Sequence, residues 1–327
     1  MGIVDMHCDT ISRLYQNGED LGRNSGHIDL EKMRHSGYTL QNFALFINLE
    51  QTREPFETVL QMAALFEREM EKGKEWIAPV CSCADIEKNR KAGKMSALLT
   101  VEEGGVCQGK LSRLEELYGL GVRMLTLTWN YPNELGYPNM HLRKGEKPDF
   151  LTPDMTHGLT ETGIAFVEKM EEIGMIPDVS HLSDAGFYDV LKYTRKPFVA
   201  SHSNARTVCR NVRNMTDDMI RRLAERGGVI GLNFCEDFLT DVSEEGRKKE
   251  NVLEALVQHA KHIINVGGVE CLGLGSDFDG IDGNRALPDA AEMEVLAQAL
   301  KRAGFTPSML EKVWEENVLR VYREVLR

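Results

Sequence analysis

His7 and Asp9 stand two residues apart at the end of a short apolar run, within VDMHCDT. Side chains at positions i and i+2 of a strand point to the same side, so this imidazole and this carboxylate would converge on one point where a metal ion can bind. The same pair also fits a surface histidine beside an aspartate that caps a helix starting near Thr10. An H-x-D pair alone does not decide between these interpretations, and the other ligands must come from elsewhere in the chain.

Four further predicted strands end in a residue that can bind a metal or transfer a proton. These residues are Glu102, His181, His202 and Asp277. Each has a structural explanation when taken alone: a solvated turn for the glutamate, a helix start or a buried hydrogen bond for the histidines, and an incomplete calcium loop for the aspartate. Their joint occurrence at strand ends favours a shared metal site.

Three imidazoles with two or three carboxylates suit zinc or a similar divalent ion. If one carboxylate bridges, two ions fit, each with about three protein ligands and an open position. Such a pair lowers the pKa of a shared water and polarises the carbonyl under attack. Asp277 would then take the proton of that water and pass it to the leaving nitrogen.

The elements that must position these residues are eight short apolar or β-branched runs separated by helical patterns. The runs are residues 3–7, 42–47, 97–102, 123–129, 176–181, 198–202, 228–234 and 271–278. Eight buried parallel strands alternating with helices predict an α/β fold, a (β/α)8 TIM-like barrel, as a single domain over residues 1–327. An open doubly wound sheet is the alternative. A G-x-G-x-x-G after the first strand would favour that sheet, and the sequence has none there.

Helix signals fill the segments between the runs. Helices are predicted for residues 160–174, for 216–227 with Thr216 as N-cap, for 251–266, and after Thr306-Pro307. Residues 48–95 carry helical patterns at 58–74 and 84–92. Residues 130–159, rich in Asn, Pro and Gly, are expected to form a long loop that builds or covers the active site.

Composition excludes several classes of protein. The 39 basic and 51 acidic residues give a net charge of −12, which repels nucleic acid and anionic lipid. No apolar run approaches the ~20 residues that span a bilayer. The first residues lack the features of a secretory signal, and the seven cysteines are scattered. We therefore expect a cytoplasmic protein with reduced thiols and no membrane partner, and a homodimer is compatible with a barrel of this size.

None of the remaining histidines is expected to be catalytic. His259 and His262 lie one turn apart on a helix whose apolar stripe is elsewhere, so a solvated face is predicted for both. His27 and His35 are expected at the surface. The long loop carries His141 and His157.

Several motifs together resemble the membrane (renal) dipeptidase family, in its bacterial soluble form, among the amidohydrolase-like metal barrels. The likeness runs nearly end to end, through DMHCDT, LLTVEEGG, LGVRMLTLTWNYPNELG, GLTETG, IPDVSHLS, ASHSNARTVCRNVRNMTDD and GLGSDFDGIDG. The resemblance implies a zinc-dependent dipeptidase that cleaves free dipeptides, often with tolerance for a D-residue at the carboxyl side.

Carried over by position, the resemblance implies two zinc ions. His7 and Asp9 would bind one ion, His181 and His202 the other, and Glu102 would bridge them. The family usually has one Glu followed by two glycines, whereas here Glu102 and Glu103 stand together, and the spacing to the next strand places Glu102 at the bridge.

The resemblance also implies how the substrate is held. Arg213, rather than its neighbour Arg210, corresponds to the arginine that binds the terminal carboxylate of the substrate. Asp277 corresponds to the acidic residue near the scissile bond. Mammalian members place a substrate-contacting His where this chain has Trp129-Asn130, which bacterial members share, and Asn130 is a candidate to stabilise the oxyanion.

Two alternative functions stay open at this stage. One is another binuclear amidohydrolase that acts on a different amide or lactone. Many of these use H-x-H on the first strand and a modified lysine as the bridge, unlike the H-x-D and Glu found here. The other is a non-catalytic metal- or peptide-binding barrel, in which Asp277 would have no role.

Overall fold

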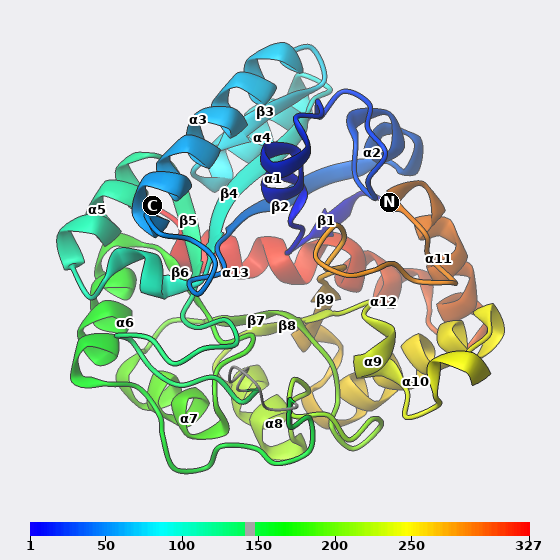
Figure 1. Cartoon of the computed structure of the whole chain (residues 1–327). Coiled ribbons are helices and arrows are strands. Elements are labelled where there is room, and N and C mark those ends of the chain that lie inside the picture. Colours follow the sequence, from blue (N-terminus) through cyan, green and yellow to red (C-terminus); the bar gives the residue numbers. More distant parts are fainter. Residues whose placement is uncertain (141–147) are drawn as a thin grey trace.

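The protein is described by a computed structural model that covers residues 1–140 and 148–327. Its strands are β1 Ile3–Asp5, β2 Tyr38–Phe46, β3 Ile77–Val80, β4 Met95–Glu102, β5 Val122–Thr126, β6 Ile176–Asp178, β7 Val199–Ser203, β8 Val229–Leu232 and β9 Leu272–Leu274. Neighbouring strands pair in parallel from β4 to β9, β9 pairs with β1, β1 with β2, and β2 with β4. Eight strands thus close into a ring with helices around it (Figure 1), which confirms the predicted (β/α)8 barrel.

The strand that the sequence analysis missed is β3. It pairs, in the described part of the chain, with β4 alone, through residues 95–98. Its four residues include Pro79, which lacks an amide donor and is tolerated only where a strand has a free edge. The predicted excursion of residues 48–95 therefore contains a strand between its two helices.

The helices are α1 Thr10–Asn17, α2 Leu30–Ser36, α3 Pro55–Lys72, α4 Cys83–Lys91, α5 Leu111–Gly119, α6 Glu161–Ile173, α7 Asp184–Tyr193, α8 Asp217–Glu225, α9 Glu236–Leu239, α10 Lys249–Gly267, α11 Met293–Arg302, α12 Pro307–Glu311 and α13 Asn317–Val325. The predicted caps Thr216 and Thr306 are present, and each accepts a backbone N–H from the first turn of the helix that follows. Thr160 caps α6 in the same way. Among the described residues, none of these helices combines the length and apolarity required to cross a bilayer.

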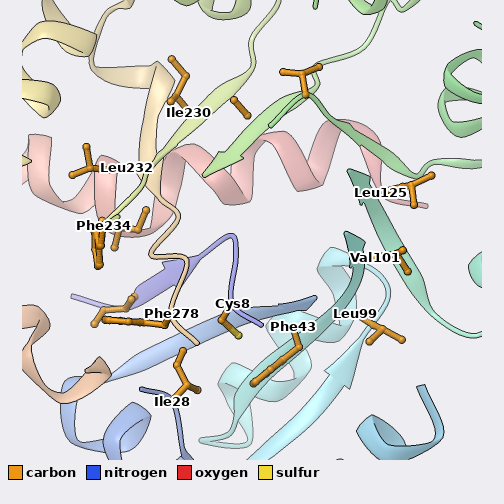
Figure 2. Packing of buried hydrophobic residues seen from close by; sticks show 14 of the residues in the cluster. Cys8, Ile28, Phe43, Leu99, Val101, Leu125, Ile230, Leu232, Phe234 and Phe278 are labelled. Carbon is orange, nitrogen blue, oxygen red and sulfur yellow. The ribbon is translucent and has the colours of Figure 1, made fainter. Parts of the chain in front are cut away.

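The two faces of β4 show how the barrel is packed. Leu99 and Val101 belong to the large cluster between the strands and the outer helices (Figure 2). Leu98 belongs to a second cluster inside the barrel, together with side chains of other strands and of α13. Because side chains alternate along a strand, Glu102 shares the inward side with Leu98 and stands at the carboxyl end of the barrel.

Helix α13 closes the opposite end of the barrel. It runs across the ring as the red helix of Figure 1 and packs against the inward-facing residues of the strands. The Tyr322 hydroxyl donates a hydrogen bond to Asn42 Oδ1 at 2.8 Å. A solid core therefore supports the strand ends, as expected for a barrel whose interior is filled by side chains.

The prediction of a solvated His259 is wrong. This side chain is fully buried. Its Nδ1 accepts the Ala205 N–H at 3.1 Å, and its Nε2 donates to the Leu239 carbonyl at 3.0 Å. The helix packs this face against the loops that follow β7 and β8, which the helical pattern alone does not reveal. His262 is half-buried, and its Nε2 forms a hydrogen bond with Asp217 Oδ1 at 2.7 Å.

His259 should make the stability of the protein sensitive to acid. Burial lowers its pKa to about 4, so between that value and the ordinary pKa of about 6.5 the unfolded chain binds a proton that the folded chain excludes. The free energy of unfolding therefore keeps the full contribution of His259 above about pH 6.5. It loses this contribution as the pH falls towards about 4, the pKa of His259 in the folded protein. Between about pH 7 and about pH 5 the loss should amount to about 2 kcal/mol.

Urea unfolding of wild type and His259→Gln at several pH values measures this loss. The free energy of unfolding should depend less steeply on pH in the variant than in wild type. The exposed His35 provides the control, because His35→Gln should keep the wild-type slope. Equal slopes in wild type and His259→Gln would contradict the assignment.

Candidate metal centre

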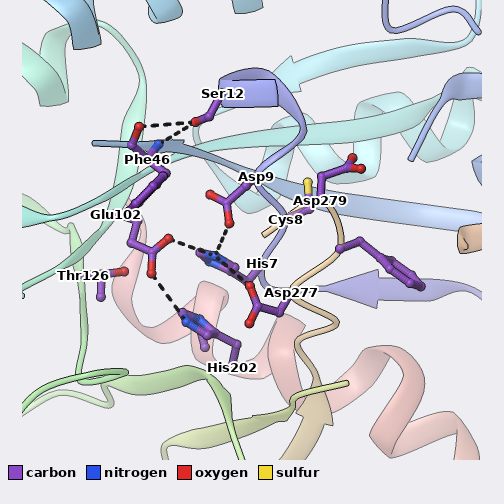
Figure 3. A network of polar contacts seen from close by, with 12 residues as sticks. His7, Cys8, Asp9, Ser12, Phe46, Glu102, Thr126, His202, Asp277 and Asp279 are labelled. Carbon is purple, nitrogen blue, oxygen red and sulfur yellow. Dashed lines mark hydrogen bonds and ion pairs between the residues drawn. The ribbon is translucent and has the colours of Figure 1, made fainter. Parts of the chain in front are cut away.

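The five predicted metal ligands and the predicted proton carrier Asp277 lie together at the carboxyl end of the barrel. Figure 3 labels all of them except His181. His7, Asp9, Glu102, His181, His202 and Asp277 are all buried, with at most 8% of each residue exposed. Within the described residues they form three overlapping groups, each with ligand atoms within 4.8 Å of one another: His7–His202–Asp277, Glu102–His181–His202, and His7–Asp9–Glu102. The sequence therefore located one cluster from five separate strand ends.

The carboxylate of Glu102 lies at the centre of the cluster. Its Oε2 is 3.3 Å from His7 Nε2, while its Oε1 is 3.1 Å from His181 Nε2 and 3.6 Å from His202 Nε2. Asp9 Oδ2 and Asp277 Oδ1 approach His7 Nε2 at 3.5 and 3.9 Å. One carboxylate thus faces both halves of the cluster, which is the arrangement that a bridging ligand requires.

Hydrogen bonds on the far side of each ring set the tautomers of His181 and His202. His181 Nδ1 donates to Asn130 Oδ1 at 2.8 Å. Ser201 Oγ donates its proton to Asp178 Oδ2 at 2.6 Å, so it accepts from His202 Nδ1 at 2.8 Å. Both rings therefore carry a lone pair on Nε2, and these two atoms are 3.1 Å apart.

The donor set fits a bound cation. Two Nε2 lone pairs and a Glu102 oxygen face one another, and without a cation only a proton relieves their repulsion. Burial and the Asp9 charge raise the pKa of Glu102 to about 8. His7 Nε2 and Asp9 Oδ1 are buried without hydrogen-bond partners among the described residues. Bound divalent cations would satisfy these groups.

The charges of the imidazoles differ. Burial, with the positive charges of Arg213 and His7, holds the pKa of both His181 and His202 well below its usual range, so both rings are neutral. Burial also disfavours a charged His7, but the carboxylates of Glu102 and Asp9 outweigh it and raise the pKa of His7 well above its usual value. Neutral imidazole is the form that binds a metal.

Two residues at the cavity edge have strained backbones. His181 and Asp277 adopt φ values of 69° and 63°, in the left-handed region that L-residues seldom occupy. Each lies just beyond a strand, and the local turn directs its side chain inward. Such conformations persist where the surrounding structure enforces them, which is common at functional sites.

A cavity of about 970 Å³ opens above the cluster. Asp9, Glu102, His181 and Asp277 line it, together with Trp129 and Asn130. The Trp129 ring packs edge-on against Phe46, with ring centroids 4.8 Å apart. The predicted substrate-binding pair Trp129–Asn130 thus borders the cavity next to the metal-binding groups.

Arg213 lies beneath the cavity wall. It is 4% exposed and is not among the described residues that line the cavity. Its guanidinium carbon lies 5.3 Å from the centroid of the Phe238 ring, which does line the cavity. Nη2 donates to the His202 carbonyl at 3.1 Å, whereas Nε has no acceptor in the described structure.

The sequence analysis missed two supporting groups. Asn233 donates to Asp277 Oδ2 at 2.9 Å and thereby orients this carboxylate. Its place in the seventh predicted strand, near the end, was the available signal. Glu103 is also fully buried, and its carboxylate accepts the Trp129 N–H at 3.0 Å.

Asp279 and His27 join two loops rather than binding the cluster. Asp279 accepts the Thr10 hydroxyl at 2.7 Å and the His27 N–H at 2.6 Å, and its own N–H donates to His27 Nδ1 at 2.9 Å. His27 therefore lines the cavity, contrary to the predicted surface position. His157 is exposed and His141 lies outside the described residues.

The chain was compared with known families and structures. The model of the membrane dipeptidase family, peptidase family M19, matches residues 1–327. An uncharacterised dipeptidase of Schizosaccharomyces pombe is 32% identical over 313 residues, which are 92% of this chain and 72% of that protein.

Two solved structures are similar over nearly the whole chain. One is a metallopeptidase of Rhodobacter sphaeroides, solved with a phosphinate mimic of the dipeptide L-Ala-D-Ala, with a TM-score of 0.90, 25% identity and 99% of each chain covered. The other is the dipeptidase AC, a metallopeptidase of family M19, with a TM-score of 0.90, 26% identity and coverage of 100% of this chain and 99% of that one. The chain belongs to the membrane dipeptidase family and is a metallopeptidase of the dipeptidase type.

Proposed function

We propose that this protein is a zinc-dependent dipeptidase that hydrolyses the peptide bond of free dipeptides, including those with a D-residue at the carboxyl side. The observation that carries the proposal is the cluster of facing acceptors, in which the Nε2 atoms of His181 and His202 and the carboxylate of Glu102 converge without a donor between them. The metallopeptidase solved with an L-Ala-D-Ala mimic supports the substrate class.

In this proposal two zinc ions share the cluster. His7 and Asp9 would hold one ion, His181 and His202 would hold the other, and Glu102 would contribute to both. When bound, two divalent ions activate water for attack and polarise the carbonyl of the scissile bond. The imidazole and carboxylate ligands are those that zinc prefers.

Asp277 is the proposed proton carrier. It lines the cavity beside the cluster, and the Asn233 amide holds its Oδ2. Burial raises the pKa of Asp277 to about 6, near the value at which a general base works best in neutral solution. Its carboxylate takes a proton from the attacking water and delivers it to the leaving nitrogen.

The substrate ends are assigned to Arg213 and to the Trp129–Asn130 pair. The three arginines that line the cavity, Arg13, Arg247 and Arg285, are each ion-paired with acidic residues. Arg213 lies behind the cavity wall and does not line the cavity, but its buried Nε–H has no acceptor among the described residues, and we assign the terminal carboxylate of the substrate to it. Trp129 provides an apolar wall, and Asn130 lies beside the carbonyl under attack.

The seven cysteines are free thiols, which is compatible with action in a reducing cytoplasm, as proposed from the sequence.

Metal content and hydrolysis should be coupled. We expect two zinc ions per chain, cleavage of L-L and L-D dipeptides that chelation abolishes and zinc restores, and a loss of about 10²- to 10⁴-fold in kcat for Asp277→Asn. Elemental analysis and a dipeptide panel measure these quantities. Asp277→Asn should keep both ions, because its proposed role is proton transfer.

The panel separates the alternatives. Two ions without dipeptide cleavage would assign the site to another amide or ester. A protein that binds no zinc and cleaves nothing would refute the proposal, as would full activity in Asp277→Asn.

Arg213→Lys should mainly weaken substrate binding. The lysine ammonium keeps the charge but loses the fork that holds a carboxylate through two hydrogen bonds, so KM should rise by about 10- to 100-fold with a smaller change in kcat. Steady-state kinetics on a dipeptide and on its carboxyl-terminal amide test the contact, because the amide should be insensitive to the substitution.

The exposed neighbour Arg210 offers a matched control, since Arg210→Lys should behave as wild type. Equal kinetic changes on the dipeptide and its amide would show that Arg213 serves the structure and not the carboxylate.

A further inference from the structure

Glu103 is a fully buried carboxylate surrounded by hydrogen-bond donors. Its Oε2 accepts the Trp129 N–H at 3.0 Å, and its Oε1 accepts the Gly105 N–H at 2.7 Å and the Asn133 side-chain amide. A buried carboxylate is costly unless such donors satisfy it. Glu103 takes no direct part in the proposed binding of metal or substrate.

The backbone of Glu103 is held in an unfavourable conformation. Its φ of 98° lies in the left-handed region, where a residue with a Cβ is strained and glycine is not. Chain reversal after β4 requires this conformation, because the 3-10 helix Gly104–Cys107 begins at the next residue. The strain places the carboxylate of Glu103 beneath the segment that follows β5.

Residues 127–133, the segment that follows β5, are held by hydrogen bonds at both ends. Asn133 donates to the Leu127 carbonyl at 2.9 Å as well as to Glu103, and Glu103 binds the Trp129 N–H. Asn130 lies between these anchor points, and its Oδ1 accepts His181 Nδ1–H at 2.8 Å. Two hydrogen bonds, joined by the peptide link between Trp129 and Asn130, therefore connect Glu103 to the His181 ring.

Close packing defines the position of the segment further. A Cβ on Gly104 would lie 2.8 Å from the Leu127 carbonyl oxygen and 2.6 Å from Leu135 Cδ1. A Cβ on Gly105 would lie 2.9 Å from Asn133 Cβ. The segment thus packs directly against these two glycines. Because Asn130 belongs to this segment, a change in the hydrogen bonds that hold the segment should move Asn130.

We infer that Glu103 is a positioning residue for the metal centre. Its carboxylate anchors residues 127–133 so that Asn130 holds His181 with its proton on Nδ1 and its Nε2 lone pair directed at Glu102. The inference rests on the proposed function for the role of His181 as a ligand. Hydrogen-bond partners of metal-bound histidines typically change metal affinity or activity by about 10- to 100-fold when they are removed.

A double-mutant cycle tests this inference. Glu103→Gln keeps the size of the side chain, but its amide group must replace one acceptor oxygen and so loses at least one of the three hydrogen bonds. Asn130→Ala removes the contact with His181. Zinc affinity, measured by competition with a chelator, is the first quantity to compare, followed by kcat and KM on a dipeptide and by the thermal midpoint.

We expect Glu103→Gln to weaken zinc binding by about tenfold and Asn130→Ala by about 10- to 100-fold. If Glu103 acts through Asn130, the double variant should bind zinc as Asn130→Ala does, within about twofold. Independent effects that multiply, or wild-type zinc affinity in Glu103→Gln, would overturn the inference.

Glu69 on α3 provides a matched control. It is also a buried glutamate, and it accepts the Leu21 N–H at 2.9 Å away from the cavity. Glu69→Gln should lower the thermal midpoint while leaving zinc affinity, kcat and KM unchanged. An equal loss of zinc affinity in this control would show that the effect of Glu103→Gln is general destabilisation, which also overturns the inference.

Glu103→Gly offers a second variant that relieves the φ strain while removing the anchor. We expect faster hydrogen exchange in residues 127–133 and a loss of zinc affinity without a matching fall in the thermal midpoint. If wild type binds zinc but cleaves no dipeptide, the proposed function fails while the zinc-affinity measurements still decide the role of Glu103.

Discussion

The structure depends on an electrostatic constraint at one end of the barrel, where three imidazoles and three carboxylates are withdrawn from water. Like groups this close cannot all be charged, and the facing lone pairs of His181 and His202 cannot relieve each other. In the protein alone, a proton on Glu102 offsets part of this conflict, as its raised pKa indicates. A bound metal cation would relieve this conflict, so the burial of these groups favours cation binding at the site.

A layer of buried polar groups beneath the cluster keeps these side chains in place. Asp178 accepts the backbone N–H groups of Ser180 and Ser201, and Asp5 accepts those of His7 and Ser276. Asp178 therefore ties the loop after β6 to β7, and Asp5 ties the loop after β1 to the loop after β9. Both carboxylates also accept serine hydroxyls, so these buried hydrogen bonds hold the strand ends that carry the cluster in one arrangement.

Much of this arrangement follows from sequence because it depends on local periodicity and on the geometry of a closed barrel. His7, Glu102, His181, His202 and Asp277 stand at or just beyond strand ends, and parallel strands in a ring bring all such ends to one rim. Features set by packing between distant segments were not predictable. The burial of His259 depends on segments far away in sequence, and the contact between Arg213 and the Phe238 ring depends on a loop conformation. Strand β3 was missed for a local reason, because Pro79 is unusual in a strand. The positive φ of Glu103 agrees with the glycine that the family usually has at this position, but the hydrogen bonds of its carboxylate could not be predicted from the sequence.

The position of α13 bears on how the chain reaches its folded state during synthesis. The cluster joins residues from His7 to Asp277, and the helix that fills the far end of the barrel follows all nine strands. A nascent chain that has emerged only as far as β8 lacks β9, which pairs with β1 to close the ring. It also lacks α13, whose apolar side chains fill the interior of the barrel. The ring must therefore close late, and the contacts of greatest sequence separation carry the largest entropic cost. A chaperone that shields the inner faces of the early strands would protect the stage at which this protein is most prone to aggregate.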